Sequence, residues 1–107
     1  TVPFWKNIWR EIKRMKIAVL KLKLYAPWVH SLKEKRMIVK SLLAKIRNKF
    51  QVSAAEVEDQ DIHQSIVIGA AAIVPHSAWA DSLMDEIVRF VEENTEAEIV
   101  QEEREMR

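Results

Sequence analysis

The sequence of 107 residues has no cysteine and a single glycine, Gly69. Without cysteine it can form no disulfide and offers neither a thiolate metal ligand nor a cysteine nucleophile, which is typical of the reducing cytoplasm. One glycine is too few for the glycine-rich loops that bind phosphate groups. The longest apolar run, residues 66–74, is far shorter than the roughly 20 residues of a membrane-spanning helix. Because Lys6 and Arg10 also interrupt any signal-peptide pattern, we expect a cytoplasmic protein.

The length and the hydrophobic content of 49% predict one globular domain. We place this domain at residues 15–107 and predict an amphipathic helix over residues 1–14. Its apolar side chains recur at helical spacing and form a candidate interface: Phe4, Trp5, Ile8, Trp9 and Ile12. The opposite side is basic. Such a helix could instead lie on a membrane surface, so this alternative stays open.

Charge is distributed very unevenly along the chain. Residues 1–50 carry fourteen Lys and Arg against two acidic residues, a net charge of +12, whereas residues 51–107 carry three against fourteen, a net charge of −11. Such asymmetry is typical of a basic surface that binds nucleic acid or an anionic membrane. The two halves could equally neutralise each other within the fold, and only the arrangement of the elements decides between these alternatives.

The pattern of apolar residues predicts the order βαββαβ for the domain. Strict alternation over residues 16–25 indicates a strand with one buried face. Ser31 and Glu34 form a capping box that starts a helix running to about Phe50. The other elements are strands over residues 52–57, 65–74 and 97–105 and a helix that His76 or Ser77 caps. This is the ferredoxin-like plan, an α+β fold with two helices on one face of a four-stranded antiparallel sheet.

The usual strand order of this plan, 4-1-3-2, has consequences for charge. The last strand would lie beside the first, which places Lys21 and Lys23 next to Glu98, Glu102 and their neighbours. The basic first helix of the domain would lie beside the acidic second helix. Cross-strand and surface ion pairs are each worth up to about 1 kcal/mol, so much of the asymmetry would be neutralised within the fold.

Several short motifs resemble the YlxP-like family of small bacterial proteins. They are the segments 30–36 (HSLKEKR) and 50–57 (FQVSAAEV), followed by Gln60, Asp61 and Gln64. The resemblance covers residues 15 to about 104 and implies a ferredoxin-like fold. Members have no established activity, but their genes commonly lie among those for transcription elongation, translation initiation and ribosome maturation, which implies work on RNA or the ribosome. Ile62 and His63 stand where the family often has an aromatic residue, and residues 1–14 fall outside the family.

A cationic stripe on the first helix of the domain is the candidate RNA-binding site. Lys33, Arg36, Lys40 and Arg47 fall within about 60° on the helical wheel, with Lys35 near the helix start. Four cations on one face could follow a phosphate backbone. The alternative, which charge statistics favour, is a solvated face paired with the acidic second helix. The expected sheet lacks the central aromatic residues on which RNA-recognition modules stack bases, so contacts would be to phosphates.

Other kinds of site find little support. Glu56, Glu58, Asp59, Asp61 and His63 lie close together in sequence, but a solvated turn explains them better than a metal site. The three histidines lie far apart, and no serine stands in a nucleophile-elbow motif. We therefore expect neither a cofactor nor an enzymatic activity. The leading hypothesis is a non-enzymatic accessory factor on RNA or a ribosomal subunit; the alternative is a self-associating interaction module without nucleic acid.

The strand over residues 65–74 is apolar on both faces, which predicts that both are covered. The two helices can cover only one face. We expect the interface candidates of residues 1–14 or a second copy of the chain, in a homodimer, to cover the other, because a bare apolar face would be a large exposed patch.

Overall fold

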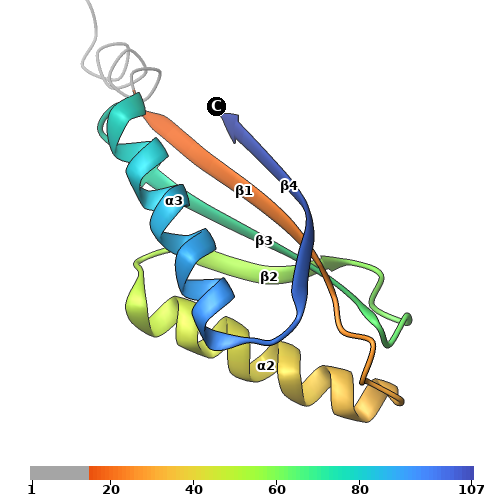
Figure 1. Cartoon of the computed structure of the whole chain (residues 1–107). Helices are drawn as coiled ribbons and strands as arrows, with labels where there is room; N and C mark the ends of the chain where they lie inside the picture. Colours follow the sequence, from red (N-terminus) through yellow and green to blue (C-terminus); the bar gives the residue numbers. More distant parts are fainter. Residues whose placement is uncertain (1–14) are drawn as a thin grey trace, which may run out of the picture.

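The computed structural model describes residues 15–107. In chain order the elements are β1 (Lys16–Tyr25), α2 (Leu32–Lys49), β2 (Ser53–Glu58), β3 (Ser65–Val74), α3 (Ser77–Asn94) and β4 (Glu98–Met106) (Figure 1). The predicted order βαββαβ is confirmed, with boundaries that differ by at most one residue. The interface candidates Phe4, Trp5, Ile8, Trp9 and Ile12 lie outside the described residues, as does the predicted helix that contains them.

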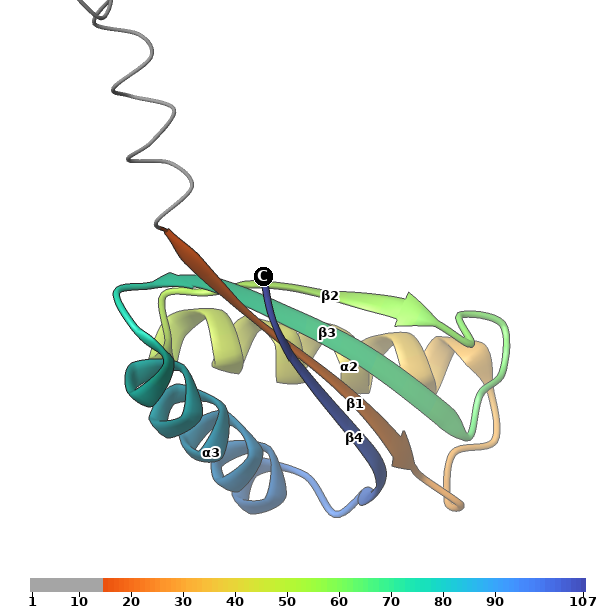
Figure 2. The ribbon, with the colours of Figure 1, turned by 90° about the horizontal axis from the view of Figure 1, so that it is seen from above.

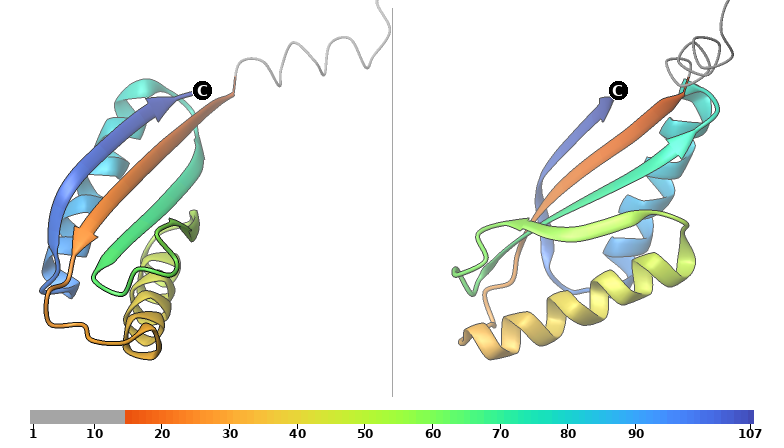
Figure 3. Two further views of the ribbon diagram at one scale, coloured as in Figure 1. Left: turned by 90° about the vertical axis from the view of Figure 1, so that its right-hand side faces the viewer. Right: turned by 180° about the vertical axis from the view of Figure 1, so that it is seen from behind.

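The four strands form one antiparallel sheet in the order β2-β3-β1-β4, which is the predicted one (Figure 2). The left view of Figure 3 shows the strands in front and both helices behind them. The domain is therefore an α+β structure in which the helices cover one face of the sheet. Neither helix of the described part of the chain combines the length and apolarity needed to cross a membrane.

The core lies between the helices and the sheet. Alternate residues of β1 are buried there as predicted, namely Ala18, Leu20, Leu22 and Leu24. The helices contribute Val39, Leu42, Leu43 and Ile46 from α2 and Ala80, Met84, Ile87 and Val91 from α3. Burying each large apolar side chain stabilises the fold by about 1.5–3 kcal/mol, so this layer supplies most of the stability. Next to Met84 in the sequence, Leu83 is only half-buried.

The other face of the sheet is apolar at one end, where β1 begins. Ile73 of β3 lies opposite Ile17 of β1, and these side chains are 69% and 41% exposed. We call this the open-face patch and define it as Ile17, Val19, Ala71 and Ile73, together with Val57 of β2, which lies nearer the middle of the sheet beside Gly69. Among residues 15–107 no element covers this patch. The prediction that residues 1–14 or a second copy of the chain covers it stays a prediction, because the structure describes neither.

On this face the side chain of Val57 occupies the space beside Gly69, which has no side chain. A β-carbon added at Gly69 would lie 3.1 Å from Cγ1 of Val57, closer than most real contacts of that kind. The only glycine of the chain therefore stands where the Val57 side chain crosses β3, next to the bulge in β2 between Glu56 and Glu58.

Candidate functional site

The start of α2 fixes the direction in which its cations point. The hydroxyl of Ser31 accepts a hydrogen bond from the backbone N–H of Glu34 at 3.1 Å, as the capping-box pattern predicts. The carboxylate of Glu34 reaches back, although it accepts from the N–H of His30 at 3.3 Å and not from that of Ser31. This cap fixes the start of α2, whose first five residues carry three of the five candidate cations.

Four of those cations are exposed as expected: Lys33, Arg36, Lys40 and Arg47. We call them the cationic stripe. Arg47 also anchors one end of the stripe to the sheet, because its guanidinium donates to the backbone carbonyl of Ala54 in the edge strand β2. The stripe therefore runs along the side of α2 that faces β2, and α3 packs beyond the other side of α2.

The cations of α2 are not neutralised by α3, which corrects the expectation of pairing between the two helices. Within residues 15–107, no member of the cationic stripe has a carboxylate within ion-pair distance, and the same holds for Lys45 and Lys49. The acidic half pairs partly with itself, since Arg104 of β4 contacts Asp85 of α3 at 2.8 Å. The positive charge of α2 is thus available on the surface.

Lys21 of β1 lies opposite Glu103 of β4, as predicted for the neighbours of Glu102, but the ion pairs of Lys21 and Lys23 are not with β4. β4 does lie beside β1, but Lys21 pairs with Glu58 and Lys23 with Asp59 at 3.9 Å, both near the end of β2. Glu102 points to the helix side of the sheet, opposite Leu22, and cannot pair with either lysine. The hydrogen bond from Lys21 to Glu58 raises the pKa of the lysine above its ordinary value.

Lys35 differs from the cationic stripe, because its side chain is fully buried. Its ammonium donates to the backbone carbonyls of Asp59 and Ile62, the latter at 2.7 Å, and lies 3.0 Å from a carboxylate oxygen of Glu56. Three oxygens thus surround it at the tip of the β2–β3 hairpin. The prediction that Lys35 contacts RNA is not supported by this geometry, since its ammonium binds the hairpin to the first turn of α2.

The hairpin tip is ordered by the same cluster. Asp59 has a φ of 56°, a left-handed conformation that Asp and Asn tolerate better than most residues. Its carboxylate accepts a hydrogen bond from the hydroxyl of Ser65 at 2.7 Å. The acidic residues here are accounted for by these contacts and by solvent. Among the described residues, no three His, Asp or Glu side chains are grouped so that they could hold a metal ion.

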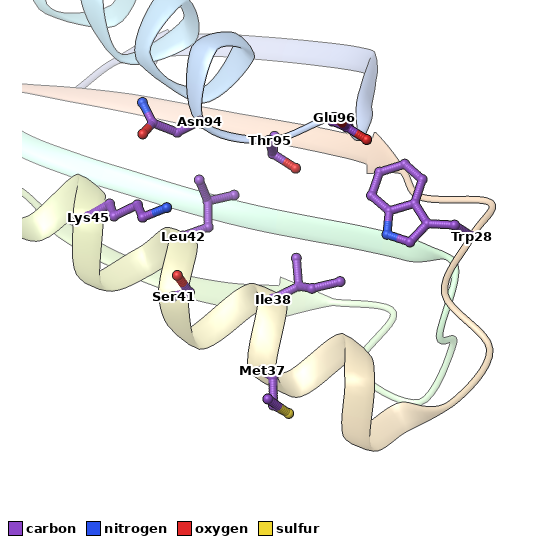
Figure 4. Close-up of a pocket in the computed structure, with 9 residues that line it drawn as sticks. All are labelled: Trp28, Met37, Ile38, Ser41, Leu42, Lys45, Asn94, Thr95 and Glu96. Atoms are coloured by element: carbon purple, nitrogen blue, oxygen red, sulfur yellow. The ribbon is translucent and has the colours of Figure 1, made fainter.

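A second feature of α2 lies on its opposite flank and was missed by the sequence analysis. A cleft of about 350 Å³ separates α2 from the end of α3, and Trp28, Ile38, Lys45, Asn94 and Glu96 are among its lining residues (Figure 4). Trp28 precedes the cap of α2, in a segment that the sequence predicts only as a loop. A tryptophan between two predicted elements is the only signal in the sequence, and it does not place Trp28 near α3.

The comparisons with known proteins agree with the resemblance found in the sequence. A family described as "Protein of unknown function (DUF503)" matches residues 17–104. The chain is also similar to a protein of Bacillus subtilis (strain 168) described as "Uncharacterized protein YlxP", with 34% identity over 68 residues. That match covers 64% of this chain and 74% of the relative. The family match over residues 17–104 includes α2 with both of its flanks and at least most of every other element of the domain.

Proposed function

Since this chain belongs to the DUF503 family of proteins of unknown function, we propose a function from its structure. The protein is a non-enzymatic accessory protein that binds RNA through the cationic stripe of α2, and ribosomal RNA is the first candidate. One observation carries the proposal: four exposed cations lie along one side of one helix and have no acidic partner among residues 15–107. Phosphates are the ligands that such a row complements, since arginine can donate two parallel hydrogen bonds to one phosphate.

The contacts are expected to go to the RNA backbone. The open face of the sheet carries no aromatic side chain in the described residues other than Tyr25, at the end of β1. It therefore lacks the platform on which RNA-recognition modules stack bases. Phosphate contacts release counterions, so the logarithm of the association constant should fall with the logarithm of salt concentration by roughly 0.7–0.9 per phosphate.

The test is filter binding of the full chain to ribosomal RNA from low to physiological salt. Lys33→Glu with Arg36→Glu should abolish binding at moderate salt and leave the melting temperature nearly unchanged, because both side chains are exposed. The matched control is Lys16→Glu with Lys49→Glu, which makes the same change in net charge with exposed residues outside the stripe. Equal loss in both variants, or no RNA binding by the wild type at low salt, contradicts the proposal.

We also propose self-association as a second candidate function, which the open-face patch favours. Exposed cross-strand isoleucines are unusual on a surface that remains in water, and a second copy of the chain could bury them. Sedimentation velocity should show a dimer that Ile73→Lys dissociates. Ile62→Lys is the control, since Ile62 is also exposed but lies in the hairpin tip. A monomer at all concentrations contradicts self-association.

A further inference from the structure

The cleft between α2 and the end of α3 has the size and the mixed lining of a small-ligand site. Its volume of about 350 Å³ lies within the usual range for such sites. Figure 4 shows Trp28 at one end and Lys45 at the other. Ile38 and Leu42 form the wall on the α2 side, and the residues from Asn94 to Glu96 form the opposite wall.

The polar wall presents more acceptors than donors. The amide nitrogen of Asn94 donates one of its two N–H groups to the carbonyl of Phe90 at 2.8 Å, which leaves one N–H as a donor and the oxygen as an acceptor. The hydroxyl of Thr95 accepts from the N–H of Ala97 at 3.1 Å and keeps its proton to donate. Glu96 is exposed and has no ion-pair partner among the described residues. A ligand that fits this wall must therefore donate hydrogen bonds.

The apolar part of the cleft suits a flat ring. Trp28 is 38% exposed, and Ile38 is half-buried against the core. Aromatic side chains of this kind stack on unpaired bases with little dependence on base identity. A leucine or phenylalanine of a partner protein would fill the same space, but it would leave the oxygen of the half-buried Asn94 without a donor, which is unfavourable.

We propose that this cleft binds one unpaired nucleobase of the RNA that α2 holds, a proposal that rests on the proposed function. The base stacks on Trp28, its exocyclic amine donates to Glu96 or Asn94, and Lys45 contacts the adjacent phosphate. Adenine and cytosine carry such an amine, whereas uracil does not. The cleft and the cationic stripe lie on opposite flanks of α2, and the exposed residues Met37, Ser41 and Ala44 lie on the surface between them. Because a helix is about 10–12 Å wide, a strand of RNA crosses it with two or three nucleotides.

The experiment measures the affinity of the full chain for oligoadenylate, oligocytidylate and oligouridylate of equal length at constant salt. The wild type should bind the first two more tightly than oligouridylate. Trp28→Ala should weaken binding of oligoadenylate by about five- to a hundredfold, the range for one base stacked on an aromatic residue. In this variant the slope of the logarithm of the association constant against the logarithm of salt concentration should stay the same. Trp79→Ala is the matched control, because Trp79 is also exposed but lies at the start of α3.

A second measurement does not depend on the folding of the alanine variant. The indole N–H resonance of Trp28, assigned with Trp28→Phe, should shift on titration with oligoadenylate, and that of Trp79 should not. The cleft proposal is overturned and the proposed function stands if RNA binds with the expected salt slope but three results are negative. These results are an unchanged affinity in Trp28→Ala, equal affinities for the three oligonucleotides, and an indole resonance of Trp28 that does not shift. If no RNA binds at low salt, both are overturned.

Discussion

Lys35 and Arg36 are neighbours in the sequence, yet the structure assigns them opposite roles. Lys35 is fully buried, with three oxygens around its ammonium, whereas Arg36 is exposed and has no acidic partner in the described part of the chain. A rotation of 100° about the axis of α2 separates the two positions. The comparison teaches that a basic motif is not uniformly a basic surface: one of its cations joins helix to hairpin, and only the others are available to a partner.

The sharpest way to break this comparison is to make the same substitution at a buried and at an exposed lysine of α2. Lys35→Met leaves Glu56 as a buried charge without a partner and removes the donor to two carbonyls. We expect a loss of about 3–5 kcal/mol in the free energy of unfolding, measured by urea denaturation. Lys40→Met, at an exposed position, should change it by less than about 0.5 kcal/mol. Similar losses in the two variants would show that Lys35 is not buried in solution.

A double-mutant cycle separates the ion pair from the other contacts of Lys35. Glu56→Gln removes the carboxylate charge, so in the Lys35→Met background it should restore part of the lost stability. We expect a coupling energy of about 1–3 kcal/mol between the two positions. One oxygen of Glu56 makes no directed hydrogen bond in the described residues, so the coupling should come from charge. Strictly additive losses would mean that the backbone carbonyls, and not Glu56, hold the ammonium.

The cap of α2 is common to the buried and the exposed cations, and its loss should have an intermediate effect. Ser31→Ala removes the acceptor for the N–H of Glu34 and is expected to cost about 1 kcal/mol. Ser41→Ala, in the middle of the same helix, should be neutral or slightly stabilising, since alanine has the higher helix propensity. Thermal denaturation followed by circular dichroism compares the two variants. An unchanged melting temperature for Ser31→Ala would contradict the capping geometry.

The smallest effect is expected from a lysine that is paired but lies in solvent. The pKa of Lys21 is raised above its ordinary value of 10.5, chiefly by the hydrogen bond to Glu58. The folded state thus holds this proton more tightly than the unfolded state. The contribution to stability is complete below the unfolded pKa and disappears as the pH rises through the folded pKa. Urea midpoints of the wild type and Lys21→Met should therefore differ slightly at pH 8 and coincide well above pH 10.5; a difference that grows with pH would contradict this.

Most of the fold could be predicted from the sequence, because each element carries a local signal. Alternation marks β1, the capping box marks the start of α2, and Pro75 ends β3. Even the burial of Lys35 had a signal that was not used. It lies four residues before Val39 and seven before Leu42, so it belongs to the buried stripe of the helix.

The candidate site was only partly predictable, because its properties depend on distances across the fold. The stripe of four cations follows from helical periodicity alone, but the lack of acidic partners depends on where α3 and β4 place their carboxylates. The partners of Lys21 and Lys23 depend on the bulge in β2, which shifts Glu58 into register with Val67. Likewise, the cleft beside Trp28 exists only because the end of α3 stands away from α2, which no local pattern encodes.

The buried ammonium of Lys35 also has a consequence for the order of folding events. Its carbonyl partners lie 24 and 27 residues further along the chain, so these contacts close a long loop and form only when α2 has docked beneath the hairpin. We expect contacts that close such a loop to form late in folding, and late contacts affect the unfolding rate more than the folding rate. Lys35 should therefore slow the unfolding of the native state. The backbone amides of the hairpin tip should exchange with solvent only when the contacts of Lys35 break, and the frequency of this event should partly determine the lifetime of the folded protein.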